Sequence, residues 1–153
     1  GKSDSIRRIT PETLVDVLDG RFSALTDFRV IDVRFPFEYD GGHIAGAINV
    51  NSFEDLDAMF FTGGDHVPRA MHTTAIIFHC EFSSHRAPAM AMHLRAQDRI
   101  VNMAKYPAVY YPEIYVLEGG YKRFWSELPS RCTPHGAYIP MDHEEFRDVC
   151  KHE

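Results

Sequence analysis

The sequence predicts an α/β fold, with a central parallel sheet flanked by helices. Short β-branched runs alternate with segments that carry helix signals, and this alternation is typical of parallel α/β proteins. The run TAIIF over residues 74–78 is apolar and β-prone, as expected of a central strand. With 153 residues, the chain is long enough to bury a core without disulfides or metals, and we expect residues 1–153 to form one domain.

The N-terminal third predicts a helix followed by two short strands. Residues 10–20 carry a threonine N-cap, a proline at the first helical position and a glycine stop, so they predict an amphipathic helix. Residues 29–34 form a β-branched run that breaks at Pro36 and predict a strand. A glycine turn at residues 41–42 leads into a second short strand that ends near residue 50.

The remaining two thirds continue this alternation. The pattern predicts a helix over residues 52–61, a loop over 62–65, the central strand, and a helix from Arg86 to about Met103. A strand over residues 114–117, a turn over 118–120 and a helix from residue 121 follow, the last with an aromatic core face. We expect residues 129–141 to be irregular and residues 142–151 to form a short helix.

Polar residues stand where the predicted strands end. Ligands of open parallel sheets bind outside the carboxyl ends of the strands. The residues at such ends are Asp32, Arg34, Cys80 and Glu118. We expect Asp32 to bond the neighbouring loop or a nearby arginine, and Glu38 and His43 to anchor turns. The site is therefore predicted around Cys80.

Cys80 and Arg86 bracket five residues between the central strand and the next helix. Backbone N–H groups in such a loop can converge on one point and bind an anion, and a guanidinium adds a bidentate clamp. The loop therefore fits a phosphoryl group. Its predicted phosphate-binding residues are Glu81, Phe82, Ser83, Ser84, His85 and Arg86.

Cys80 is the candidate nucleophile. A lone cysteine after a buried strand is more often packing, but the preceding His79 and the arginine six positions later favour catalysis. Positive partial charge in the loop favours the reactive thiolate, which could attack phosphorus and form a phosphocysteine that water hydrolyses. Glu81 or His85 could protonate the leaving oxygen, and His79 could orient the loop.

Composition argues against several other classes of function. The three cysteines, Cys80, Cys132 and Cys150, and the scattered histidines predict neither a disulfide scaffold nor a metal site, and we expect no cofactor. The net charge of −6 disfavours nucleic acid, and no apolar run reaches the roughly 20 residues that span a bilayer. We expect a cytosolic or nuclear protein, and the start without methionine indicates either a fragment of a longer protein or a cleaved tag.

Four motifs carry a family resemblance. Residues 31–47 read IDVRFPFEYDGGHIAGA, residues 79–88 read HCEFSSHRAP, residues 111–122 read YPEIYVLEGGYK and residues 138–141 read YIPM. Together they resemble the cell-division-cycle dual-specificity phosphatases that activate cyclin-dependent kinases, a family with the three-layer rhodanese-like fold. The resemblance spans the chain from about residue 5 to 150.

The resemblance implies removal of phosphate from adjacent phosphothreonine and phosphotyrosine of a cyclin-dependent kinase, which promotes the onset of mitosis. The implied partner is a phosphorylated cyclin-dependent kinase–cyclin complex, and the protein itself is expected to be a monomer. Cys80 would be the nucleophile and Arg86 the phosphate clamp. Glu81 would be the general acid that protonates the leaving oxygen. Arg95 and Arg99 match positions that help to dock the kinase.

The sequence departs from the family pattern at three positions. His85 replaces an acidic residue, which leaves Glu81 or a proton on the substrate as the acid. Val33 replaces a cysteine that could trap the nucleophile as a disulfide, so oxidation of Cys80 is expected to proceed to irreversible forms. Ala89 replaces a basic residue, which weakens the predicted docking surface.

Three other functions remain as alternatives. Rhodanese-like sulfurtransferases share the fold, but their loop is typically one residue shorter. Arsenate reductases bind a phosphate mimic but need a partner thiol, for which Cys132 and Cys150 are not obviously placed. A binding domain without activity would not need both Cys80 and Arg86.

Overall fold

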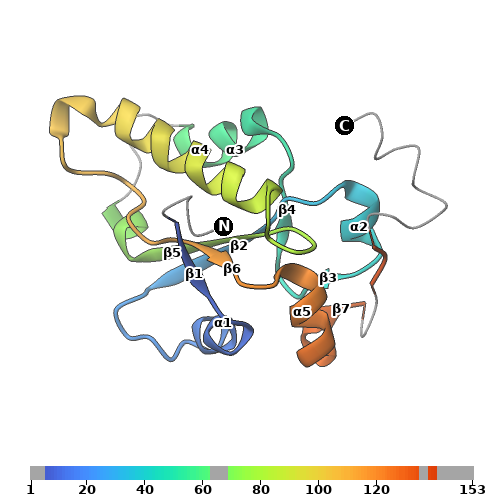
Figure 1. The fold of residues 1–153 in the computed structure, drawn as a ribbon. Coiled ribbons are helices and arrows are strands. Elements are labelled where there is room, and N and C mark those ends of the chain that lie inside the picture. The colour runs from blue at the N-terminus through green and yellow to red at the C-terminus, as the bar shows by residue number, and fades with distance from the viewer. Residues whose placement is uncertain (1–5, 63–68, 135–137, 141–153) are drawn as a thin grey trace.

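The computed structural model describes residues 6–62, 69–134 and 138–140, and it confirms the predicted three-layer α/β architecture (Figure 1). Five strands form a parallel sheet in the order β1-β6-β5-β2-β4. They span Arg7–Ile9 (β1), Asp27–Asp32 (β2), Ile48–Asn49 (β4), Thr74–His79 (β5) and Ile114–Leu117 (β6). The predicted central strand, β5, indeed pairs with a strand on each side.

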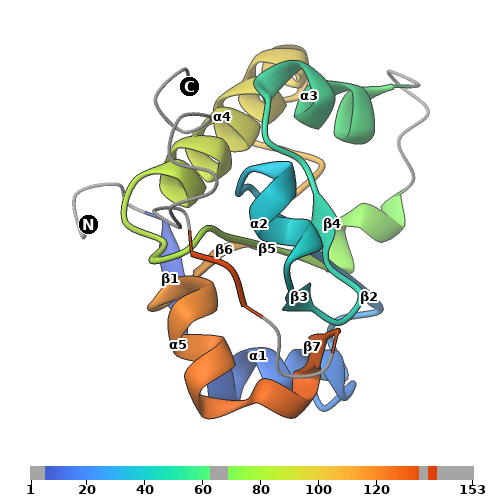
Figure 2. The same ribbon diagram turned by 90° about the vertical axis from the view of Figure 1, so that its right-hand side faces the viewer.

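Helices cover both faces of the sheet (Figures 1 and 2). Helices α3 (Phe53–Phe61) and α4 (Arg86–Val101) lie on one face, and α1 (Pro11–Leu18) and α5 (Gly120–Glu127) lie on the other. Three short 3-10 helices, η3 (Arg69–Thr73), η4 (Met103–Lys105) and η5 (Pro129–Arg131), follow or precede these elements. Thr10 caps α1 and Ser52 caps α3 through their side chains, as helix-start signals predict.

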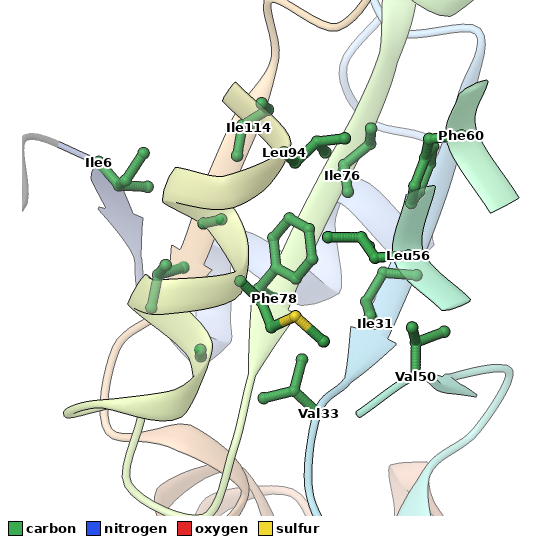
Figure 3. Close-up of a cluster of buried hydrophobic side chains, with 14 of the residues drawn as sticks. Ile6, Ile31, Val33, Val50, Leu56, Phe60, Ile76, Phe78, Leu94 and Ile114 are labelled. Atoms are coloured by element: carbon green, nitrogen blue, oxygen red, sulfur yellow. The ribbon is translucent and has the colours of Figure 1, made fainter. Parts of the chain in front are cut away.

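Strand β5 shows how the sequence builds two cores from one sheet. Ile76 and Phe78 pack with Leu94 of α4 on one face (Figure 3), whereas Ala75 and Ile77 pack on the face that α1 and α5 cover. Successive side chains of a strand point to opposite faces. All six residues of β5 are buried, because both faces of the central strand are covered, and this explains its unbroken apolar run.

The chain does not simply break at Pro36. Helix α2 (Pro36–Asp40) begins there, because proline fits the first helical position. The backbone N–H of Phe35 donates to Glu38 Oε1 at 2.8 Å, which ties the start of this helix to its own first turn.

Some of the shortest strands have no counterpart among the predicted elements. They are β1 and the antiparallel pair of β3 (His43–Ile44) with β7 (Cys132–Thr133). Strand β7 lies in the stretch that was expected to be irregular. Two or three residues are too few to show an alternating pattern, so pairing across the fold decides these strands.

Three predictions lie partly or wholly outside the described residues: the loop over 62–65, the irregular stretch over 129–141 and the helix over 142–151. In the part of the chain that the structure describes, no helix has the length and apolar character needed to cross a membrane. The same residues contain no group of three or more histidine, cysteine or acidic side chains that could hold a metal ion.

Candidate active site

The loop between β5 and α4, residues 80–86, lies at the carboxyl end of the central strand, and we call it the cysteine loop. Cys80 directly follows β5 and is 3% exposed, and Arg86 is the first residue of α4. The residues between them are mixed in exposure: Glu81 and Ser83 are buried, and Phe82, Ser84 and His85 are exposed. The structure therefore has the predicted strand–loop–helix arrangement.

The N-terminus of α5 holds the first two peptide groups of the cysteine loop. The backbone N–H of Tyr121 donates to the Cys80 carbonyl at 2.9 Å, and that of Lys122 donates to the Glu81 carbonyl at 3.0 Å. In a trans peptide, a carbonyl and the N–H that follows it point in opposite directions. The N–H groups after these two carbonyls therefore point away from α5.

This contact requires glycine at the start of α5. Gly120 has a φ of +64°, and a Cβ built there would lie 2.7 Å from the Cys80 carbonyl oxygen and closer still to that of Glu81. A side chain would thus push the loop away from the helix. The sequence pattern predicts only a turn at Gly120, because its partner lies 40 residues earlier and leaves no local signal.

A buried carboxylate holds Arg86. Arg86 Nη1 donates to Glu38 Oε1 at 3.0 Å, and its guanidinium carbon lies 5.2 Å from the centre of the Phe35 ring. Burial opposes the charge of Arg86, but the hydrogen bond and charge of Glu38 outweigh it and raise the pKa of the guanidinium above its usual value. Glu38 is fully buried, so it is a turn anchor, as predicted, and also the support of the predicted phosphate clamp.

Asp32 and Arg34 form a fully buried ion pair at the same end of the sheet. Arg34 Nη2 donates to Asp32 Oδ2 at 2.7 Å, and its guanidinium carbon lies 4.2 Å from the centre of the Tyr121 ring. Burial opposes ionisation of Asp32, but His79 and the hydrogen bonds and charge of Arg34 keep the pKa of that carboxyl below its usual value. The structure thus gives Asp32 the nearby arginine that was predicted as one of its two partners.

His79 lies between this ion pair and the cysteine loop. Its Nδ1 is 3.2 Å from the Cys80 carbonyl oxygen, and its Nε2 is 3.7 Å from Asp32 Oδ2. Burial lowers the pKa of His79 below its usual value, which favours the neutral ring. The position agrees with the predicted role of His79 as a support of the loop.

The Glu81 side chain contacts the fourth sequence motif. The Tyr138 hydroxyl donates to Glu81 Oε1 at 2.5 Å, and burial together with this carboxylate raises the pKa of Tyr138 above its usual value. The sequence motif gives no role for Tyr138, and the structure makes it the orienting partner of Glu81. The role of Glu81 or of the exposed His85 as the acid stays a prediction.

Arg95 and Arg99 lie one turn apart on α4, the first half-buried and the second exposed. They line a shallow pocket together with Asp98, Pro107, Val109, Tyr111 and Pro112. Burial, and then the charge of Arg99, lower the pKa of Arg95. Arg95 lies nine residues after Arg86, roughly 14 Å along the helix. The structure therefore brings these arginines together, but away from the cysteine loop.

Curated proteins of known name match nearly the whole chain. It is 43% identical over 152 residues to M-phase inducer phosphatase 1 of Mus musculus, a match that covers 99% of this chain and 29% of the relative. It is 45% identical over 150 residues to the M-phase inducer phosphatase of Schizosaccharomyces pombe, covering 97% of this chain and 24% of the relative. The chain thus spans between about a quarter and three tenths of these relatives' length.

Solved structures share the fold at lower identity. An As–Sb reductase from Leishmania major has a TM-score of 0.58 at 24% identity, covering 96% of this chain and 99% of that one. A Saccharomyces cerevisiae protein, described as a homologue of single-domain rhodanese and of the Cdc25 phosphatase catalytic domain, has a TM-score of 0.60 at 21% identity and covers 92% of each chain. The model of the rhodanese-like domain matches residues 11–127. The chain belongs to the rhodanese-like domain family.

Proposed function

We propose that this domain is the catalytic part of a dual-specificity protein phosphatase, which removes phosphate from phosphotyrosine and phosphothreonine of cyclin-dependent kinases. The observation that carries this proposal is the cysteine loop, with five residues between Cys80 and Arg86 and its first two carbonyls held by α5. Relatives named M-phase inducer phosphatases support it. We propose that the domain acts as a monomer in the cytoplasm and nucleus and promotes the onset of mitosis.

The chemistry follows from the loop. Its backbone N–H groups and Arg86 bind the non-bridging oxygens of a phosphate ester, which places phosphorus above Cys80. The Cys80 thiolate attacks phosphorus, the S–P bond forms, and the ester P–O bond breaks. The leaving oxygen takes a proton from Glu81 or from the phosphate monoanion itself. Water then attacks the phosphocysteine, releasing inorganic phosphate and the thiolate.

An assay of two reactions tests the proposal. The wild-type domain is given a small aryl phosphate and, separately, thiosulfate with cyanide as the sulfur acceptor. We expect phosphate release and no sulfur transfer, because a loop of this length accommodates a tetrahedral phosphoryl group. A phosphopeptide that carries adjacent phosphothreonine and phosphotyrosine should then be dephosphorylated at both residues. Sulfur transfer without phosphate release would show a sulfurtransferase instead.

Glu38→Gln should lower kcat/KM for a small aryl phosphate by about tenfold or more. The amide oxygen of glutamine can still accept from the Phe35 N–H, but the charge that holds Arg86 is lost. Steady-state kinetics on the folded variant measure the effect. Glu54→Gln, at an exposed position of α3, is the matched control. An unchanged kcat/KM in Glu38→Gln would show that Arg86 needs no support from this carboxylate.

We propose that Arg95 and Arg99 dock the phosphorylated kinase–cyclin complex. Their side chains add positive charge to a shallow surface pocket about 14 Å along α4 from Arg86, where a folded substrate could make a second contact. The double variant Arg95→Glu/Arg99→Glu should lower the ratio of kinase to aryl phosphate activity by at least about tenfold. The control is Arg21→Glu, a charge reversal at a residue that follows α1, on the face of the sheet opposite to α4. It should leave this ratio unchanged. An unchanged ratio in the double variant would place docking elsewhere.

A further inference from the structure

Ser83, in the middle of the cysteine loop, has an unusual backbone conformation. Its φ is +59°, and among the described residues it is the one non-glycine residue with a positive φ. The left-handed region is unfavourable for a residue with a Cβ, so such a turn persists where the surroundings hold it. Ser83 is also fully buried. The loop therefore depends on a contact that keeps Ser83 in this conformation.

Arg8 of β1 makes that contact from the other end of the sequence. Its Nη1 donates to the Ser83 carbonyl oxygen at 2.9 Å, across a separation of 75 residues. A hydrogen bond from a guanidinium is stronger than one between neutral groups. This bond fixes the Ser83 carbonyl in the direction of Arg8, a residue of another element.

The direction of one carbonyl decides the direction of the next N–H. The peptide group is planar and trans, so a Ser83 carbonyl that points toward Arg8 turns the Ser84 N–H away from Arg8. The N-terminus of α5 does the same for the peptide groups after Cys80 and Glu81. We propose that Arg8 is a positioning residue for phosphate binding, which aims the Ser84 N–H at the bound oxyanion. This inference rests on the proposed function of the loop.

The neighbouring arginine provides a matched control on the same strand. Side chains of β1 alternate between faces: Ile6 packs in the core beneath α4, whereas Ile9 packs toward α1. Arg8 shares the face of Ile6. Arg7 points to the other face, where its guanidinium carbon lies 5.1 Å from the centre of the Tyr115 ring. The two arginines thus have the same charge and nearly the same position, but one of them contacts the cysteine loop.

The test measures binding of inorganic tungstate, a tetrahedral oxyanion, by calorimetry, and hydrolysis of a small aryl phosphate. Arg8→Met should weaken tungstate binding and lower kcat/KM by about tenfold each, because the Ser84 N–H loses its orientation. Arg8→Lys should lie between wild type and Arg8→Met, since an ammonium can donate one hydrogen bond. Arg7→Met should bind tungstate as wild type does. Thermal unfolding shows which variants are folded.

Each outcome decides between the proposals. If folded Arg8→Met binds tungstate as tightly as the wild type does, the inference is overturned. It is also overturned if Arg7→Met loses as much tungstate affinity as Arg8→Met, because such a loss would indicate a general effect of charge. If Arg8→Met does not fold, Arg8→Leu, which also lacks a hydrogen-bond donor, is measured instead against the same expectations. Tungstate binding that depends on Arg8, without hydrolysis of the ester, would overturn the proposed function alone. A wild-type protein that does not bind tungstate would overturn both.

Discussion

Cys80→Ser should abolish phosphate release, with kcat lower by about 10⁴-fold or more. A serine hydroxyl does not ionise at neutral pH, so the nucleophile that attacks phosphorus is lost. The oxygen replaces sulfur with little change in shape, and the carbonyl of residue 80 can still accept from the Tyr121 N–H. The variant should therefore still bind tungstate. Phosphate release and calorimetry on the same preparation measure the two properties.

The other buried cysteine of the described residues provides the control. Cys132 is 3% exposed, as Cys80 is, but lies on β7, with its thiol 3.8 Å from the Leu128 carbonyl oxygen. Cys132→Ser should keep turnover per folded molecule near that of wild type. Substantial turnover by Cys80→Ser would contradict a phosphocysteine intermediate. An equal loss in Cys132→Ser would show that the assay reports packing rather than chemistry.

Arg34→Met should lower the free energy of unfolding at pH 7 by about 3–5 kcal/mol. Methionine fills much of the space of the arginine stem, but Asp32 is left as a buried charge without its partner. Equilibrium denaturation by urea measures the loss. Arg131→Met, which removes the exposed pair with Asp19, is the matched control and should change the free energy of unfolding far less.

The loss in Arg34→Met should shrink as the pH falls toward 4. In the wild type, the pKa of Asp32 is lowered by folding, so its stabilisation is present above the unfolded value of about 3.9 and is lost below it. Without Arg34, burial would raise this pKa, so the penalty grows as the pH rises above about 3.9. A loss that did not vary with pH would indicate lost packing rather than an unpaired carboxylate.

The fold could be predicted from the sequence where a pattern is long enough to repeat. The apolar run of β5 and the capped helices α1 and α3 carry such patterns, and each of them forms where it was expected. Strand β1 has three residues and β7 has two, and their pairing depends on β6 and β3, which are far away in the sequence. Tertiary contacts decide such strands, and no local signal describes those contacts.

The residues of the candidate site also divide into those that the sequence could predict and those that it could not. Cys80 and Arg86 could be found because the loop that joins them is continuous in the sequence. Their supports could not, because Glu38, Arg8 and Tyr138 act through contacts that join distant parts of the chain. Glu38 was expected to anchor a turn, but its second partner, Arg86, lies 48 residues later. Residue types at the loop thus predicted the chemistry, and only the folded chain reveals what holds the loop in shape.

The distant supports of the cysteine loop have a consequence for how the protein folds. Pairs as far apart as 75 and 48 residues must meet before the loop takes its shape, and closing such long loops is entropically costly and slow. Helix α4 and its neighbours can form earlier through local contacts. Partly folded chains would then hold Cys80 without an ordered anion site. An ordered anion site therefore requires that both β1, which carries Arg8, and α2, which carries Glu38, lie in place beside the cysteine loop.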